Sequence, residues 1–466
     1  MNKKYKRLIG DMGIFALGAL GSKLVLFLLL PIYTHVLTDS EYGIADLIFT
    51  IGDLLMPFVS LAIFNGLLRY GLINGKKNNS LLCASIVFVC GSIISVFVTP
   101  LVGLYRPISD WKWYVCAYVI AHFARSNSLV YLKVKNKNKL YSILSIVQAL
   151  ALVGCNVLLL IVFKLGIQGY LLSTIVSNAL LSVMAFILGG TWKDLKAATF
   201  EKPLLKEMMV YSFPFIFNDV SWWIIHSSDK IMIEWMIGGA MLGIYTAASK
   251  IPSLINVVTS IFSQAWGLAS IKEYDSSNDT GFYSNVFNYF SIVIYGAAIF
   301  IIAITKPFMS FYVGKAFAES WHFVPLLLVS AVFLAIANYT GSLYGALKKS
   351  RYIMTTSNIA SVVNIILNYV FIKMVGVYGA VIGTVSAYFI VSFLRVIDLR
   401  KRMGVDFKLK RTVILTILVL VQAIMVGFDF HVYIVSIVAI VLYLIVTKND
   451  LISIGRIISK RLKSMR

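Results

Sequence analysis

Charged side chains inside long apolar runs are the residues of this sequence that could do chemistry. Two such runs lie between Met209 and Ile271, and their charged members are Asp219, Asp229, Lys230, Glu234 and Lys250. An ionisable side chain at the centre of a bilayer costs roughly 2.5 to 3.5 kcal/mol, so such residues normally face a polar interior and mark a pathway. Lys230 and Glu234 could pair at i, i+4. Lys250 has no acid within a turn, which favours a pathway.

Basic side chains in these runs are candidates for binding an anion. Lys23, Arg69, Arg125 and Lys250 have no carboxylate three or four positions away. Arginine can hold a phosphate through two parallel hydrogen bonds, and lysine acts as a point charge. We predict these four residues and Lys230 as substrate-binding residues. Arg69 and Arg125 lie near run ends, where extension of the side chain to the headgroups is the alternative.

Acidic side chains form a second set of candidates. Asp46 and Asp53 stand at i, i+7 on one face of the second apolar run, and Asp219 and Asp229 lie in the seventh. An internal repeat, described below, places Asp46 and Asp53 in the region that corresponds to Lys250. We therefore predict these four acids as gate residues or as a site for a coupling ion, H⁺ or Na⁺. Stable scaffolding pairs remain the alternative.

The sequence contains no GxSxG or HExxH catalytic motif and no nucleotide-binding motif. Gly75-Lys76 and Gly314-Lys315 lack the earlier glycine of a phosphate-binding loop. The five histidines have no ligand spacing, and the four cysteines lie in apolar runs without a CxxC pair. We predict no enzymatic activity, no cofactor and no metal site, with transport driven by an ion gradient or by the substrate's own gradient.

The elements that must position these residues are membrane-spanning helices. Of the 466 residues, 59% are hydrophobic and 13% are charged, which excludes a soluble globular protein. About 20 apolar residues cross a bilayer. We predict fourteen spans, at about 8–36, 42–73, 81–104, 112–132, 140–163, 168–190, 208–237, 241–270, 283–305, 321–346, 353–373, 377–397, 412–428 and 431–447. The predicted divisions are two six-span lobes, 1–192 and 207–402, and a segment 403–466 with two spans and a basic tail.

The residues that give the net charge of +22 lie mainly in the loops between the predicted spans. Lysine and arginine gather in alternate loops, and this asymmetry places both chain ends in the cytoplasm. The charge therefore reflects membrane topology, and we predict no nucleic-acid partner.

An internal repeat relates the first six spans to the next six. Gly43 in the second span recurs as Gly243 in the eighth, and the pair Gly166 and Gly169 recurs as Gly376 and Gly379. Each copy has an even number of spans, so both enter the membrane from the same side. Prolines near the ends of the equivalent spans, including Pro57 and Pro252, are candidate bending points.

Several segments resemble the polysaccharide-transporter (Wzx-type) flippases of the multidrug/oligosaccharidyl-lipid/polysaccharide superfamily. They are PIYTHVLTDSEYGIADL, SSDKIMI, LGIYTAASKIPSL and GVYGAVIGTVSAY. The resemblance implies an all-α, MATE-like bundle with two V-shaped lobes that open alternately. It also implies flipping of undecaprenyl-pyrophosphate-linked oligosaccharide, of O-antigen or capsule type, across a bacterial inner membrane. Membrane lipids and a polysaccharide polymerase are the implied partners.

Two other functions remain open from the sequence. A multidrug antiporter of the same superfamily would need a cavity rich in carboxylates. A membrane-embedded glycosyltransferase or polymerase would usually carry a large loop outside the membrane. The longest loop on that predicted side, KPFMSFYVGKAFAES, is short.

Overall fold

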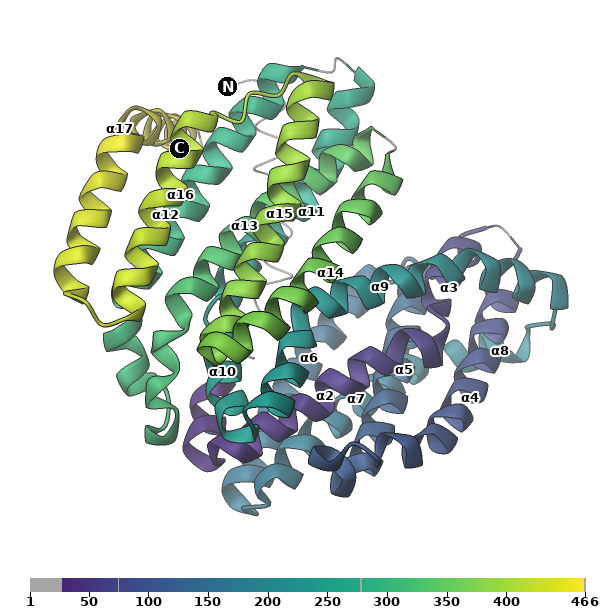
Figure 1. The fold of residues 1–466 in the computed structure, drawn as a ribbon. Coiled ribbons are helices and arrows are strands. Elements are labelled where there is room, and N and C mark those ends of the chain that lie inside the picture. The colour runs from purple at the N-terminus through teal and green to yellow at the C-terminus, as the bar shows by residue number, and fades with distance from the viewer. Residues whose placement is uncertain (1–26, 74, 277–278, 348, 465–466) are drawn as a thin grey trace. The chain divides into compact units, whose positions relative to one another are not determined.

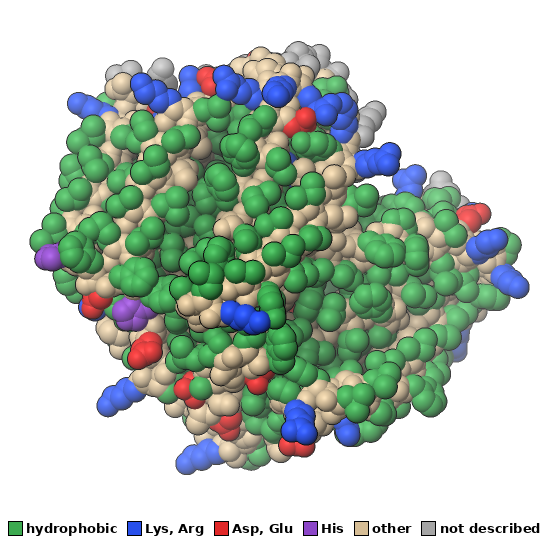
Figure 2. All heavy atoms as spheres, in the orientation of Figure 1, with side chains coloured by type: hydrophobic (Ala, Val, Ile, Leu, Met, Phe, Trp, Pro, Cys, Tyr) green, Lys and Arg blue, Asp and Glu red, His purple; other side chains and the backbone are tan. Residues whose placement is uncertain are grey.

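The structure is a computed structural model that describes residues 27–73, 75–276, 279–347 and 349–464. Its elements over these ranges are helices, and no strand occurs among them (Figure 1). Large apolar side chains such as Phe97, Leu104 and Phe311 are more than two-thirds exposed. Figure 2 shows hydrophobic side chains covering much of the visible helix surfaces. An all-α protein with this surface is a multi-pass membrane protein, which confirms the predicted fold class.

Contacts divide the chain into two compact units, one of which extends from Gly21 to Thr246. We call it the first unit. Its described helices are Phe27–Val36, α2 (Asp39–Ser60), α3 (Ile63–Gly71), α4 (Lys77–Val102), η1 (Arg106–Trp111), α5 (Lys112–Val134), α6 (Asn138–Asn156) with its π-helical continuation η2 (Val157–Val162), α7 (Gly166–Gly189), α8 (Thr191–Lys196) and α9 (Lys202–Met236). Helix α10 (Gly239–Lys250) begins in this unit, and α2 packs against both α5 and α9.

The second unit includes the residues from Ala247 onward. Its helices are α11 (Ser253–Ser276), α12 (Thr280–Tyr312), η3 (Lys315–His322), α13 (Val324–Ala346), α14 (Ser350–Val375), α15 (Val377–Met403), α16 (Leu409–Gly427) and α17 (Val432–Ser464). Helix α13 is its central element, because it contacts α11, α12, α15 and α16 and is buried along most of its length. The lobe boundaries taken from the sequence repeat stay a prediction.

Ten described helices are long and apolar enough to cross a membrane, or eleven if α10 and α11 form one bent span. Helices α5 and α9 are long enough but are not among them, and both carry charged side chains in their middle. The first predicted span lies largely outside the described residues. The count of fourteen therefore stays a prediction, although the other thirteen predicted ranges all overlap helices.

Two predicted spans, 42–73 and 241–270, are interrupted. The range 42–73 contains two helices, because Leu61 and Ala62 adopt left-handed backbone angles, each with φ of 48°, between α2 and α3. Pro57, which cannot donate a backbone hydrogen bond, precedes this break. Pro252 lies between α10 and α11. Both prolines thus lie at or near the ends of helices.

Glycines bring α2 and α10 into close contact within the first unit. A Cβ atom at Gly43 would lie 2.7 Å from the backbone nitrogen of Gly243, and one at Gly243 would lie 1.8 Å from the carbonyl oxygen of Asp39. Neither position can carry a larger residue without movement of the backbone. The two glycines that are equivalent under the sequence repeat therefore meet at this crossing.

Candidate functional site

One face of α2 carries the acids of the first unit. Asp46, Thr50 and Asp53 stand at i, i+4 and i+7, so helix geometry aligns them. Asp46 is buried, whereas the Asp53 side chain is 48% exposed. An exposed carboxylate this far inside a spanning helix requires hydration or a polar neighbour, because hydrocarbon supplies neither.

Asp46 forms an ion pair with Lys230 of α9. The Lys230 Nζ atom lies 2.6 Å from Asp46 Oδ2, and the two side chains are only 14% and 8% exposed. Two turns earlier on α9, Trp223 donates from Nε1 to the Thr50 carbonyl oxygen at 2.9 Å. These two contacts set the register of α9 against α2. They join one predicted gate acid to one predicted substrate-binding base.

Asp229, the residue before Lys230, points to another neighbour. It is 3% exposed and accepts a hydrogen bond from the Tyr245 hydroxyl of α10. Asp229 and Asp53 both act electrostatically on Lys230. Lys230 therefore lies among three carboxylates, one of which is its direct partner. Glu234, the local partner that the i, i+4 spacing allowed, forms no ion pair with the described residues.

Asp53 faces α5. The Tyr118 hydroxyl donates to Asp53 Oδ1 at 2.7 Å, and His122 Nδ1 lies 3.5 Å from the same oxygen. Arg125 follows one turn later and lies within electrostatic range of Asp53. Tyr118, His122 and Arg125 share one helical face at i, i+4 and i+7.

Arg125 is the member of this group whose guanidinium makes no hydrogen bond to the described residues. Its Nε atom is buried, and within the described ranges the side chain forms no hydrogen bond or ion pair. Arg125 lies nine residues before the end of α5, which corresponds to about 13 Å along the helix. A charged donor group buried without an acceptor is costly unless a ligand or water supplies one.

We call Asp46, Asp53, Arg125, Asp229 and Lys230 the first-unit charge cluster. It holds three acids and two bases. Protonation of one acid, or release of one ion pair, would free a cation to bind an anionic group. The cluster thus combines an anion-binding donor with acids that can exchange partners.

The other predicted site residues lie elsewhere. Asp219 is half-buried on α9 and accepts from the side chain of Asn218 at 3.3 Å. Arg69 is exposed in the last turn of α3. Lys250 is the last residue of α10 and belongs to the second unit, so a pair with Asp46 or Asp53 stays a prediction. Lys23 lies outside the described residues.

Sequence reasoning missed several participants. Tyr118 and Tyr245 carry no prediction from the sequence, and Trp223 differs from most other tryptophans only in lying in mid-span. The histidines, His122 included, lack ligand spacing. The spacing of Tyr118, His122 and Arg125 on one face of an apolar helix is a signal that could have found them. Trp223 and Tyr245 carry no local signal, because only the packing of α9 and α10 gives them partners.

A second buried cation, Arg395 of α15, lies in the second unit and is 1% exposed. Its acceptors are neutral. They are Thr356 Oγ1 at 2.9 Å, the carbonyls of Ala337 at 3.0 Å and Ile353 at 3.1 Å, and Ser357 Oγ at 3.0 Å. Its neighbour in sequence, Asp398, accepts from Tyr344 and Arg402 instead, each at 2.6 Å. Arg395 therefore joins α13, α14 and α15.

No group of three or more His, Cys, Asp or Glu side chains suited to a metal ion occurs within the described ranges.

Residues 8–267 match the family model described as polysaccharide biosynthesis protein. No curated protein sequence matches significantly. Among solved structures, the lipid II flippase MurJ in an inward closed conformation aligns with a TM-score of 0.69 at 15% identity, over 94% of this chain and 99% of MurJ.

Multidrug transporters of the MATE family also share the fold. An inward-facing member of the MOP superfamily aligns with a TM-score of 0.63 at 14% identity, over 84% of this chain and 98% of its own. A point mutant of VcmN, a MATE transporter of Vibrio cholerae, aligns with a TM-score of 0.57 at 12% identity, over 87% and 98%. At these identities the likeness establishes the fold.

Proposed function

The chain belongs to the polysaccharide biosynthesis protein family, and from that premise we propose that it flips a lipid-linked oligosaccharide across a membrane. The family match supports a role in polysaccharide assembly, and the fold is shared with a lipid II flippase. The substrate class proposed is an undecaprenyl-pyrophosphate-linked repeat unit of O-antigen or capsule type.

Arg125 is the observation that carries this proposal. A partly buried guanidinium without an acceptor, beside Asp53 and one turn from His122, suits a pyrophosphate oxygen. Arginine binds such groups through two parallel hydrogen bonds, and exclusion of water strengthens them. Lys230 is the second donor in this proposal, once it leaves Asp46.

Partner exchange at Lys230 links binding to an ion. In the structure the Lys230 charge is matched by Asp46. A proton on Asp46 would remove that match and leave Lys230 free for the pyrophosphate. Loss of the proton would restore the pair and expel the anion. This cycle needs no nucleotide, in keeping with a chain that lacks a phosphate-binding loop.

The cellular setting of the proposal rests on the loop charges and on the family resemblance. The loop charges support both chain ends in the cytoplasm. The resemblance implies a bacterial inner membrane, whose cytoplasmic leaflet the oligosaccharide would leave. Lys23, Arg69 and Lys250 stay candidate substrate ligands, and Asp219 stays a candidate gate residue. A polysaccharide polymerase would receive the flipped unit.

The test is flipping of a fluorescent undecaprenyl-pyrophosphate oligosaccharide in proteoliposomes without ATP. Arg125→Gln should lower the initial rate about tenfold to a hundredfold, because a hydrogen bond to a charged group contributes about 1.5 to 3 kcal/mol. Arg125→Lys should keep part of the rate. Arg106→Gln is the matched control, since Arg106 is exposed in η1. Wild-type rates in Arg125→Gln would contradict the proposal.

A multidrug antiporter of the same fold is the second candidate. The three acids and two bases of the first-unit charge cluster leave one excess negative charge, which favours a cationic ligand. Export of an organic cation that is driven by a proton gradient, abolished by Asp46→Asn and unaffected by Arg125→Gln, would favour this candidate.

A further inference from the structure

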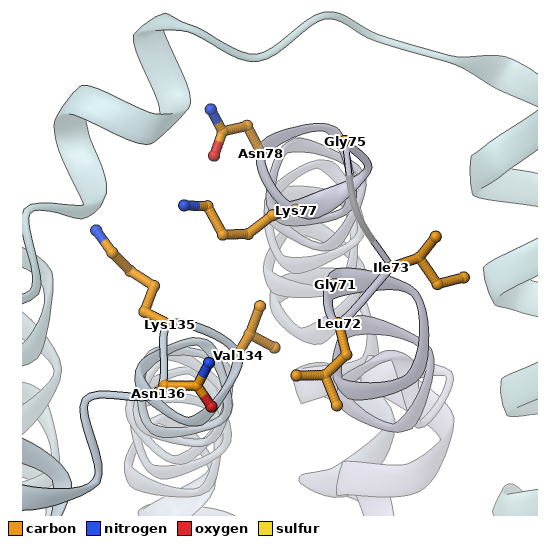
Figure 3. A pocket seen from close by; sticks show the side chains of 9 residues that line it. All are labelled: Gly71, Leu72, Ile73, Gly75, Lys77, Asn78, Val134, Lys135 and Asn136. Atoms are coloured by element: carbon orange, nitrogen blue, oxygen red, sulfur yellow. The ribbon is translucent and has the colours of Figure 1, made fainter.

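A pocket separate from the first-unit charge cluster opens at one end of the first unit. It measures about 470 Å³ and lies between the end of α3, the start of α4 and the end of α5. Its lining residues are Gly71, Leu72, Ile73, Gly75, Lys77, Asn78, Val134, Lys135 and Asn136. Figure 3 shows the Lys77 and Lys135 ammonium groups on the same side of the pocket, although Lys77 begins α4 and Lys135 directly follows α5.

Two lysines make the pocket cationic. Lys77 is half-buried, and its side chain finds no acceptor among the residues that the structure describes. Lys135 donates to the Gly189 carbonyl at 2.8 Å and to Asp194 Oδ2 at 2.5 Å. Asp194 pairs directly with Lys135 and also acts electrostatically on Lys77. The two lysines therefore share one acid, and the pocket keeps one excess positive charge.

The start of α4 adds further donors. Its N-cap residue, Lys76, makes no side-chain hydrogen bond to the first backbone N–H groups of this 26-residue helix. The positive end of a helix attracts anions. Asn78, in the same turn, has a buried Oδ1 atom without a donor. The pocket thus offers several donors for an anion and one acceptor for a hydroxyl or ammonium group.

Apolar residues form the opposite wall. Leu72 and Ile73 are 56% and 43% exposed, and Figure 3 shows them across the pocket from the two lysine ammonium groups. Such side chains gain little from a soluble anion but bury apolar surface against an acyl chain. An amphipathic pocket of this kind, where basic loops meet spanning helices, suits a lipid headgroup.

We propose that this pocket binds the phosphate group of an anionic membrane lipid. Lys77 and the first turn of α4 hold the phosphate, Asn78 accepts from a headgroup hydroxyl such as that of glycerol, and Leu72 with Ile73 contacts the acyl chains. The bound lipid would tie the ends of α3, α4 and α5 together. The inference stands independently of the substrate proposed above.

The experiment is native mass spectrometry of the delipidated full-length protein titrated with phosphatidylglycerol. Lys77→Gln should weaken the first binding step about tenfold, which is the effect of losing about 1.4 kcal/mol. Lys77→Arg should retain binding. Lys206→Gln is the matched control, since Lys206 is exposed on α9 outside the pocket. Phosphatidylcholine, whose headgroup lacks the net charge, should bind less tightly and show no dependence on Lys77.

Two outcomes would overturn the assignment. The first is equal phosphatidylglycerol binding by Lys77→Gln and wild type, or an equal loss in Lys206→Gln. The second is full displacement of the lipid by inorganic phosphate at matched ionic strength, because the pocket would then bind free phosphate and the apolar wall would contribute nothing. If inorganic phosphate does not displace phosphatidylglycerol, and binding of the lipid depends on Lys77, the phosphate group in the pocket belongs to a lipid.

Discussion

The two units hold their buried cations in different ways. In the first unit, Lys230 has one direct partner, the Asp46 carboxylate at 2.6 Å, on a different helix. In the second unit, Arg395 has four neutral acceptors that come from α13 and α14. The Lys230 charge is stabilised by one carboxylate, whereas the Arg395 charge is stabilised by four neutral oxygen atoms.

This difference in acceptors shows which of the two cations can lose its partner when a neighbouring group is protonated. A buried ion pair loses its balance when its acid is protonated, and the freed cation then needs a new partner. Neutral acceptors do not titrate in the physiological range, so Arg395 keeps its partners at every such pH. Lys230 is therefore suited to a transport cycle and Arg395 to a fixed junction of three helices.

The largest effect should come from removing the cation of the first unit. Lys230→Met removes the cation that balances the buried Asp46 carboxylate and should destabilise the protein by about 3 to 5 kcal/mol. Thermal unfolding in detergent measures the loss. The double variant Lys230→Met with Asp46→Leu should recover most of it. Absence of recovery would show that Asp46 is not the residue that makes the single change costly.

A smaller effect is expected from Arg395→Lys. Lysine keeps the charge but cannot reach four acceptors in fixed directions, so we expect a loss of about 1 to 3 kcal/mol. Transport per folded molecule should stay unchanged if Arg395 is only a junction. A transport defect in an Arg395→Lys protein of normal thermal stability would show that Arg395 takes part in the transport cycle, as Lys230 is proposed to do.

Tyr118→Phe tests the outer part of the first-unit charge cluster. Loss of the hydrogen bond to Asp53 should cost about 1 kcal/mol, since Asp53 is half-exposed and water can replace the hydroxyl. Thermal unfolding in detergent measures the loss. An unchanged melting temperature in Tyr118→Phe would show that this hydrogen bond does not stabilise the packing of α5 against α2.

The smallest effect concerns Asp194 of α8, outside the spans. Burial raises the pKa of its carboxyl, but the hydrogen bonds from Lys135 and Tyr131 and the Lys135 charge outweigh this, so the pKa lies below its usual value. A lowered folded-state pKa stabilises the protein above the unfolded value of about 3.9 and ceases to do so as pH falls through the folded value.

Asp194→Asn should therefore cost up to about 1 kcal/mol at pH 7. The difference in melting temperature from wild type should persist to about pH 5 and shrink below pH 4. A difference that grows as the pH falls would contradict the assigned direction. The variant also gives the effect of a partly buried pair outside the spans, with which the effect of Lys230→Met can be compared.

Local pattern determined the helices and which residues share a helical face. The apolar runs predict the described helices, and the i, i+7 spacing predicts that Asp46 and Asp53 lie on one side of α2. The repeat of Gly43 at Gly243 is also visible in the sequence. These features depend on chain-local periodicity, which the sequence contains directly.

Only the tertiary structure decided the partners. Spacing alone favours Lys230 with Glu234 and Arg395 with Asp398, yet Lys230 pairs with Asp46, 184 positions away, and Asp398 binds Tyr344 and Arg402. A local pair within a helix contributes only about 0.3 to 0.5 kcal/mol. The packing of whole helix faces outweighs that local preference and determines which charged residues meet. The glycine contact of α2 with α10 is part of this packing.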